Sequence, residues 1–498
     1  MGGASRKRPA ASKHQAASPS RIRVRMYRQG LGDCFLVSLL LARGEPFHIM
    51  IDCGVILGTP DTTSRLATVI DDIIDTAAGK VDVLVVTHEH YDHVAGFVLC
   101  DDKFAPAGKR QAGKLSVGEV WFAWTEKPGD KLAEQLREQR RKRKEALAGL
   151  LARLDEMGAA GTDQAGETDQ AGEIEQALRF FGVGKLGKDG DGTDKIGVTA
   201  RAMAIAQGLA PKVMFWEPGQ VWQSDAAPGL KIYGLGPPRD DKAFRKTDST
   251  TETYHLDAGF LEDAVRLAAG QSPDGDGEFR APFDRAHRNS LAAIVARKDT
   301  GAAAGFINEH YYGQGAANPE ADLTWRRIDE AWLGSAGQLA LALDNATNNT
   351  SLALAIELID SGKVLLFPAD AQVGNWLSWH SLRWEEDNRT VTATDLLART
   401  RFYKVGHHGS HNATLKAKGL EMMPSSGLVA FLPVDAEMAK AKRWFEMPLP
   451  HLLEALRERC GDAVVRIDKE LSSAHPGLSS GGKNGPFGSL YHEWVQLL

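Results

Sequence analysis

The 498-residue sequence contains only four cysteines, and no two of them have CxxC spacing. This scarcity argues against a thiolate zinc site and against a disulfide framework, and it favours reduced cysteines in a cytoplasmic protein. The cysteines are Cys34, Cys53, Cys100 and Cys460. The sequence also lacks an uninterrupted apolar run of the length of a membrane span, so a membrane is not expected as a partner.

An excess of positive charge is missing as well. Lysine and arginine number 59 against 65 acidic residues, which gives a net charge of −6 and no global basic field to attract nucleic acid. Residues 1–20 are basic and lack the apolar stretch of a secretory signal, so they are expected to form a disordered tail. A local basic run, Arg140 to Lys144, has two interpretations that stay open: a solvated helix face or a contact with nucleic acid.

Alternating or continuous apolar runs predict strands at both ends of the chain. A helix is predicted over residues 61–77, because its apolar residues recur at helical spacing and share one face. They are Leu66, Val69, Ile70, Ile73 and Ile74. Sheets covered by helices in two similar halves, an α+β class, are therefore expected. The predicted strands are 21–26, 34–42, 47–53, 81–86, 117–123, 230–235, 351–359, 363–367, 402–406, 429–432, 463–467 and 490–495.

Two segments interrupt this pattern and are interpreted as insertions into one domain of residues 21–498. The first, about 126–210, contains a long charged helical pattern over 131–157 and the hexapeptide TDQAGE twice, at 162–173. Two copies of six residues cannot bury a core, so the repeat is interpreted as a linker. The second insertion, about 239–340, mixes short helical patterns with polar loops.

The densest group of possible metal ligands is His88-Glu89-His90-Tyr91-Asp92-His93, which directly follows an apolar run that ends at Val86. Imidazole and carboxylate suit zinc, manganese or iron. His88, His90, Asp92 and His93 lie within six residues, so they can reach two neighbouring metals.

Further donors follow two other predicted strands. Asp370 and the pair His407-His408 each come just after an apolar strand, which is a rigid place for a ligand. Taken alone, Asp370 is equally well explained as a helix N-cap, and the histidine pair as structural. Taken together with His88–His93, they predict a two-metal site. Three tryptophans after Asp370, at 376, 379 and 384, fit core packing better than a substrate wall.

The motif THEHYDHVAG, residues 87–96, resembles the HxHxDH motif of the metallo-β-lactamase superfamily, and Asp52 with Gly54 resembles its strand-end Asp-x-Gly. Five further stretches are similar to the soluble hydrolase domain of bacterial competence (DNA-uptake) proteins and its stand-alone relatives. The resemblance implies an αββα sandwich with metals between the sheet edges, and it leaves the two insertions uncovered. The stretches are 30–39, 234–238, 348–357, 365–370 and 404–414.

The resemblance also implies roles by position. His88 and His90 would bind one metal, Asp92 and His93 the second, and Asp370 would bridge both. His408 is favoured as the last ligand of the second metal, and Asp52 would orient a ligand imidazole. The implied catalytic residues are Asp92, which orients the hydroxide, and His407 or His411, which donates a proton or contacts a phosphate.

One departure concerns the first metal, because the family often has a third histidine shortly before the strand that leads to the bridging aspartate. Here residues 344–349 contain none, and Asn348 is a weak ligand. Either the first metal is then loosely bound, or His310 or another residue of the insertion takes the place of the histidine. We therefore expect an asymmetric site in which the Asp92/His93 metal is the better held.

The function that the resemblance implies is hydrolysis by a metal-bound hydroxide, with two divalent ions, zinc or else manganese or iron. The expected substrate is a phosphodiester or related phosphoester, either a small molecule or a nucleic acid. Two alternatives stay open. One is a nucleic-acid-binding or interaction protein with a partly degenerate metal site, and the other is a hydrolase of a lactam, lactone or thioester.

Overall fold

The structure is a computed structural model that describes residues 19–158, 197–240, 301–312 and 331–498, together with Phe181, Ala243 and Leu323. Within these ranges it leaves out residues 43, 387, 388, 425, 443, 445 and 472–474. Residues 1–18 of the predicted tail and both TDQAGE copies lie outside the described residues. The first strand begins at Pro19, two residues earlier than predicted.

Two large sheets form the centre of the molecule. The first has the strand order β16-β17-β1-β2-β3-β4-β5-β6, and the second has the order β15-β14-β13-β10-β9-β8-β7. The strands of the first sheet are β1 Pro19–Tyr27, β2 Phe35–Leu41, β3 Phe47–Ile51, β4 Lys80–Val85, β5 Ser116–Ala123, β6 Lys212–Trp216, β16 Leu478–Gly481 and β17 Tyr491–Leu497. Those of the second are β7 Val221–Trp222, β8 Leu230–Gly236, β9 Ala353–Leu358, β10 Lys363–Phe367, β13 Thr400–Lys404, β14 Val429–Leu432 and β15 Val464–Arg466. A separate hairpin pairs β11 Arg383–Glu386 with β12 Arg389–Thr392.

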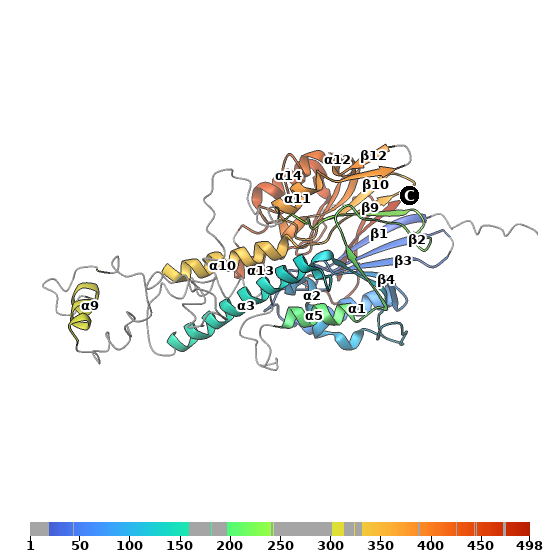
Figure 1. The fold of residues 1–498 in the computed structure, drawn as a ribbon. Coiled ribbons are helices and arrows are strands. Elements are labelled where there is room, and N and C mark those ends of the chain that lie inside the picture. The colour runs from blue at the N-terminus through green and yellow to red at the C-terminus, as the bar shows by residue number, and fades with distance from the viewer. Residues whose placement is uncertain are drawn as a thin grey trace, which may run out of the picture.

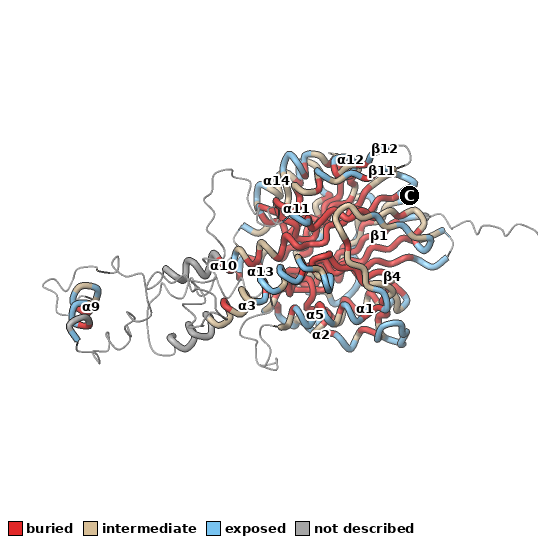
Figure 2. The backbone as a smooth tube through the Cα atoms, in the orientation of Figure 1, coloured by how far each residue is buried: buried red, intermediate tan, exposed pale blue. Residues whose placement is uncertain are grey.

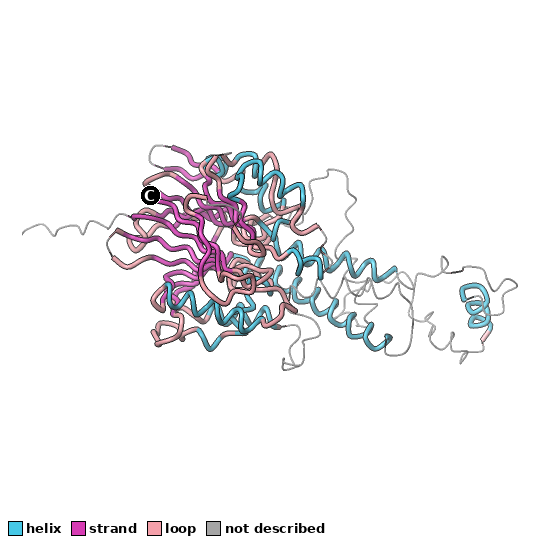
Figure 3. The backbone as a smooth tube through the Cα atoms, turned by 180° about the vertical axis from the view of Figure 1, so that it is seen from behind, coloured by secondary structure: helices cyan, strands magenta, loops and turns pink. Residues whose placement is uncertain are grey.

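The two sheets pack face to face, as the view from behind shows (Figure 3). Alternate residues of their strands share one buried cluster between them (Figure 2). Phe35 of the first sheet meets Phe367 of the second with ring centroids 5.9 Å apart, and Trp494 stacks on Phe402 across the same interface. This apolar layer joins the two halves of the chain into one sandwich.

Helices cover both outer faces of the sandwich. The first sheet is covered by α1 Thr62–Thr76, α2 Tyr91–Leu99 and α5 Val198–Gln207. The second is covered by α11 Val373–Trp379, α12 Ala393–Ala398 and α14 Pro450–Cys460, with α13 Ala436–Ala441 beside them (Figure 1). The predicted αββα arrangement is thus confirmed. Trp376, Trp379 and Trp384 are buried in the cluster under these helices, which confirms core packing over a substrate wall.

The predicted strands and the helix over 61–77 are present to within a few residues. Four of the five residues of its predicted apolar face are buried, and the fifth, Ile74, is half-buried. Two elements were not predicted. The helix α2 begins directly after His90, with Asp92 in its first turn. A negative charge at that position is favoured by the helix dipole. The edge strand β6, just past the first predicted insertion, was also missed because it is short and half-buried.

Strand direction brings the predicted ligands to one edge. The strands β3, β4, β5 and β6 are parallel, and so are β10, β13, β14 and β15. The carboxyl ends of parallel strands lie at the same sheet edge. His93 after β4 and Asp370 after β10 are in contact, so the carboxyl ends of both sheets meet.

Within the predicted insertions, two helices lie side by side and extend away from this edge in both views (Figures 1 and 3). They are α3 Lys131–Gly158 of the first insertion and α10 Ala331–Asn348, which begins in the second. The helix α9 Ala302–Tyr312 is drawn apart from the sheets. By contrast, α5 falls inside the first predicted insertion yet packs against α2 in the sandwich.

All four cysteines are free, as expected. No helix in the described part of the chain is both long and apolar enough to cross a bilayer.

Gly54 lies where backbone segments come closest beside the motif. A Cβ atom there would stand 2.1 Å from the carbonyl carbon of Asp92 and 2.3 Å from the amide nitrogen of His93. We expect Gly54→Ala to lower the free energy of unfolding by about 2 kcal/mol or more, because the first turn of α2 must shift. Chemical unfolding followed by circular dichroism measures this effect. Gly305→Ala is the control, since its Cβ would meet nothing within 4 Å. Equal loss in the two variants would contradict the prediction.

Candidate metal centre

Asp52 holds Thr87 and His93, at the two ends of the motif, through hydrogen bonds. Its Oδ1 accepts a hydrogen bond from the Thr87 amide at 2.8 Å, and its Oδ2 accepts from the Thr87 hydroxyl at 2.7 Å and from His93 Nδ1 at 2.8 Å. Because Nδ1 of His93 is held as a donor, its Nε2 is left with a lone pair. That Nε2 faces Asp370 Oδ2 at 3.1 Å. This is the contact expected of a carboxylate that orients a ligand imidazole.

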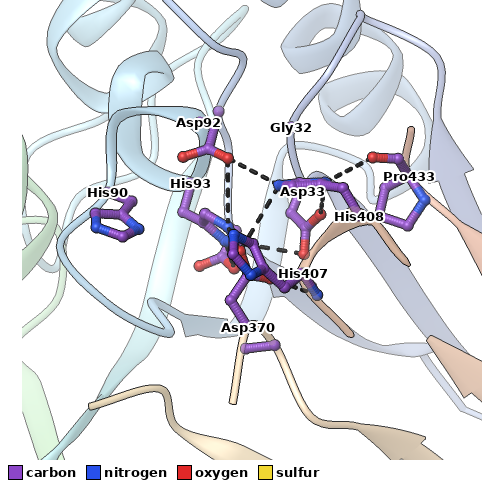
Figure 4. A network of polar contacts seen from close by, with 12 residues as sticks. Gly32, Asp33, His90, Asp92, His93, Asp370, His407, His408 and Pro433 are labelled. Carbon is purple, nitrogen blue, oxygen red and sulfur yellow. Dashed lines mark hydrogen bonds and ion pairs between the residues drawn. The ribbon is translucent and has the colours of Figure 1, made fainter. Parts of the chain in front are cut away.

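His408 is oriented in the same way by a backbone group. Its Nδ1 donates to the Pro433 carbonyl at 2.7 Å, which leaves Nε2 to face Asp92 Oδ2 at 2.8 Å. One ligand atom from each of Asp92, His93, Asp370 and His408 lies within 4.8 Å of the others, and all four residues are buried (Figure 4). The structure therefore brings together the residues expected around the second metal, and it places His408, not His407, among them.

The ring nitrogens of His88 and His90 form a second group of possible ligands. The Thr87 hydroxyl donates to Asp52, so it accepts from His88 Nδ1 at 3.1 Å. His88 Nε2 then points at His90 Nδ1, 3.0 Å away. Two ring nitrogens this close can bind the same ion, as expected for the first metal.

The two remaining predicted histidines differ from each other. His407 is buried beside the centre: its amide donates to Asp370 Oδ1 at 3.1 Å, and its Nδ1 contacts the Ser410 hydroxyl at 2.9 Å. Its Nε2 lies 3.5 Å from Asn348 Nδ2. His411 is exposed and lies outside this buried group. His310 lies on α9, which is drawn apart from the sheets, so it is not brought to the first metal.

Two charged residues that form an ion pair at the centre were not predicted from the sequence. The buried ammonium of Lys404, the last residue of β13, lies 2.6 Å from Asp33 Oδ2 and 3.0 Å from Asp370 Oδ1. Asp33 lies in the turn before β2. The available signal was the position of each charge directly beside a predicted apolar strand, in a stretch that carries the family resemblance.

The backbone is strained at this edge. Seven non-glycine residues in the described part of the chain have positive φ, and four of them are at the centre: Asp52, Ala369, His407 and His408. Such conformations cost about 1–3 kcal/mol each and persist only where the surroundings impose them. Sequence patterns carry no signal for this strain.

The acidic side chains at the centre favour a bound cation. Five buried carboxyl groups lie there, and the buried lysine Lys404 pairs with two of them. In addition, Asp92 Oδ1, Asp344 Oδ1 and Asn348 Oδ1 are buried with no hydrogen-bond partner among the described residues. A buried acceptor without a partner costs about 1–3 kcal/mol, so three together favour a bound cation. The five carboxylates are Asp33, Asp52, Asp92, Asp344 and Asp370.

The histidines divide into two electrostatic classes. Burial alone would lower the pKa of His93, but Asp370 and the other carboxylates outweigh it and raise that pKa well above its ordinary value. The pKa of His408 is raised against burial in the same way, chiefly by Asp370 and Asp92. Burial lowers the pKa of His88 well below its ordinary value and that of His90 to about 3. Positive charge is therefore most favoured at the His93/His408 group.

The basic run is largely turned inward. Lys144 donates to Glu89 at 2.6 Å, and Arg140 pairs with Glu126 at 2.8 Å and lies 3.8 Å from Glu89. Both basic side chains are buried, whereas Arg141 is exposed and pairs with acids of its own helix. Burial raises the pKa of Glu89, but Lys144 and Arg140 outweigh it and bring the pKa to about 2. Glu89 lies between His88 and His90 in the chain, so the contacts of Lys144 and Arg140 with Glu89 brace the motif, which means that α3 holds it in place.

Residues 31–159 match the model of the metallo-beta-lactamase superfamily. The matched span runs from the turn before β2 to the end of α3, and it includes Asp33, Asp52 and the whole His88–His93 motif. The match and the αββα sandwich agree, and the match favours a metal-dependent hydrolase. No curated protein matches the chain. Asp370, His407 and His408 lie outside the matched span, and geometry alone joins them to it. The narrower resemblance to competence proteins stays a prediction.

Lys404→Met would leave the carboxylates of Asp33 and Asp370 buried without their cation. For the chelator-treated protein we expect the free energy of unfolding to fall by about 3–5 kcal/mol. Urea unfolding measures this loss. Lys416→Met is the matched control, because its side chain is 89% exposed and its loss should change stability little. Equal stability of the two variants would rule out a structural role for Lys404.

A double-mutant cycle tests whether α3 braces the motif. Glu89→Gln and Lys144→Met should each destabilise the protein, and the pair should show a coupling energy of about 2 kcal/mol or more, because a lone buried charge is costly. Arg141 with Glu145 forms the control cycle on the same helix, where solvent screens the pair. The brace is refuted if the Glu89–Lys144 coupling does not exceed that of the control.

Proposed function

We propose that this protein is a two-metal hydrolase that acts on a phosphodiester or related phosphoester. The observation that carries the proposal is the convergence of Asp92, His93, Asp370 and His408 from both halves of the sandwich, next to His88 and His90. The ligand set of imidazoles and carboxylates suits zinc, with manganese and iron as alternatives. Two bound divalent cations would lower the pKa of a coordinated water and offset charge on the substrate oxygens.

The chain's own residues divide the remaining tasks. Asp92 has one oxygen on His408 Nε2, while its Oδ1 has no hydrogen-bond partner in the described part of the chain. That oxygen is available to accept a hydrogen bond from the attacking water and so to orient it. Asp370 is fixed by Lys404 and by the His407 amide, which suits a bridging ligand.

His407 is assigned the contact with substrate. Burial lowers its pKa to about 4, so it is neutral near pH 7. A neutral imidazole suits a hydrogen bond to a phosphate oxygen better than it suits the role of a strong acid. His411 is exposed, so its contribution would be limited to the outer parts of a substrate.

The phosphoester preference rests on the resemblance of five stretches to the hydrolase domain of competence proteins, at residues 30–39, 234–238, 348–357, 365–370 and 404–414. A lactam, lactone or thioester would use the same metal core. Arg140 and Lys144 are buried against acidic residues. A nucleic acid that bound the basic run 140–144 could therefore contact only its exposed residues.

Turnover of the full chain tests this proposal directly. Protein stripped by a chelator and reloaded with zinc, manganese or iron is assayed with bis(p-nitrophenyl) phosphate, with single- and double-stranded DNA, and with lactam, lactone and thioester substrates. We expect metal-dependent cleavage of the phosphodiesters. Replacing His88 and Asp92 together by alanine should reduce turnover on the order of 1,000-fold or more and remove metal.

His451→Ala is the matched control, because this histidine lies on α14 with its side chain 91% exposed. It should keep both turnover and metal content. Full activity of the stripped protein would overturn the proposal of a metal-dependent hydrolase. Turnover of a lactam, lactone or thioester alone would overturn the phosphoester preference and leave the metal centre standing.

A further inference from the structure

The two helices that come from different insertions meet at the His88–His90 side of the centre. Buried residues of α3 and α10 share one apolar cluster with Phe181, including Leu147 and Leu343. Phe181 lies against His90 with ring centroids 4.8 Å apart. On this side, therefore, the surroundings of the first metal are built by residues outside the strands of the sandwich.

Asp344 lies in the last two turns of α10, and its acidic side chain faces His90. Its Oδ1 lies 3.7 Å from His90 Nε2, and its Oδ2 accepts from Asn348 Nδ2 at 3.1 Å. The side chain is buried, and among the described residues Oδ1 has no hydrogen-bond partner. The contact between α3 and α10 is apolar, so it does not explain a buried carboxyl group beside His90.

The pair has the same arrangement as Asp52 and His93 with the ring nitrogens exchanged, although the contact of Asp344 is longer, 3.7 Å against 2.8 Å. Asp52 holds His93 Nδ1 and leaves Nε2 to face Asp370. Asp344 faces His90 Nε2 and leaves Nδ1 to face His88 Nε2 at 3.0 Å. An imidazole that binds a metal through Nδ1 must carry its proton on Nε2, and a carboxylate that accepts this proton fixes both the tautomer and the ring orientation.

We propose that Asp344 is the positioning residue for His90, so that α10 completes the site of the first metal. The inference rests on the two-metal centre of the proposed function and not on the identity of the substrate. A site that lacks the third histidine depends more strongly on the orientation of the two it has. Loss of such an orienting carboxylate weakens metal binding about 10- to 100-fold.

Metal stoichiometry separates this role from a merely structural one. Stripped full-length protein is equilibrated with buffered zinc over a range of free concentrations, and bound metal is counted by mass spectrometry. The wild type should bind two ions. Asp344→Asn should bind one of them about 10- to 100-fold more weakly and keep the other, whereas Asp52→Asn should weaken the other one. Asp344→Glu, which keeps a carboxylate, should restore part of the lost affinity.

The ion lost in Asp344→Asn must be the one bound by His88. In His88→Ala, which lacks that ion, adding Asp344→Asn should therefore cause no further loss. Wild-type affinity for both ions in Asp344→Asn, or loss of both together, would overturn the inference while the wild-type stoichiometry of two still supports the proposed function. A wild type that binds no metal would overturn the proposed function itself and the inference with it.

A measurement on the wild type removes any dependence on how well the variant folds. With histidine labelled with ¹⁵N and the protein loaded with zinc, the ring shifts should assign His90 as bound through Nδ1 with its proton on Nε2. His93 should show the opposite arrangement. Binding of His90 through Nε2 would contradict the role of Asp344, because that nitrogen would then have no proton to donate.

Discussion

The structure depends on the burial of five carboxyl groups at one edge of a sandwich whose two sheets pack through an apolar layer. Unpaired charges of one sign at this depth repel one another and cost several kcal/mol each, so the fold must supply positive charge or bind it. Lys404 supplies one fixed cation between Asp33 and Asp370. Carboxylates outweigh burial at His93 and His408 and raise the pKa of each imidazole. The same electrostatics favour a bound cation at this edge.

The topology explains why this edge can hold so many ligands. Each sheet turns from antiparallel to parallel pairing along its width, and the carboxyl ends of the parallel strands meet across the apolar layer. Ligands on strand ends and first helical turns are held rigidly. Left-handed backbone at Asp52, Ala369, His407 and His408 adds strain that the packed strands must offset. The centre is thus set by the sandwich and not by flexible loops.

How far the sequence could predict this centre follows from the range of each interaction. Strands, the helix over Thr62–Thr76 and the motif 88–93 were predictable because their patterns are local. The contacts of Lys404 with Asp33 and of Asp344 with His90 join residues hundreds of positions apart, and no local pattern records them. The basic run shows the same limit. Its composition indicates a solvated face or a nucleic-acid contact, yet Lys144 is buried against Glu89, a partner far along the chain.

The asymmetry between the two metal groups now has a structural basis. Asp92, His93, Asp370 and His408 come from the sandwich itself, and their positions follow from strand ends and the start of α2. His88 and His90 bring only two nitrogens together, and the carboxyl group that faces the other nitrogen of His90 is that of Asp344, on α10. Glu89 between the two histidines is held by Lys144 of α3. In the proposed two-metal centre, the first metal would therefore depend on elements outside the part of the fold that fixes the second. Any change that moves α3 or α10 should then act on one ion and leave the other in place.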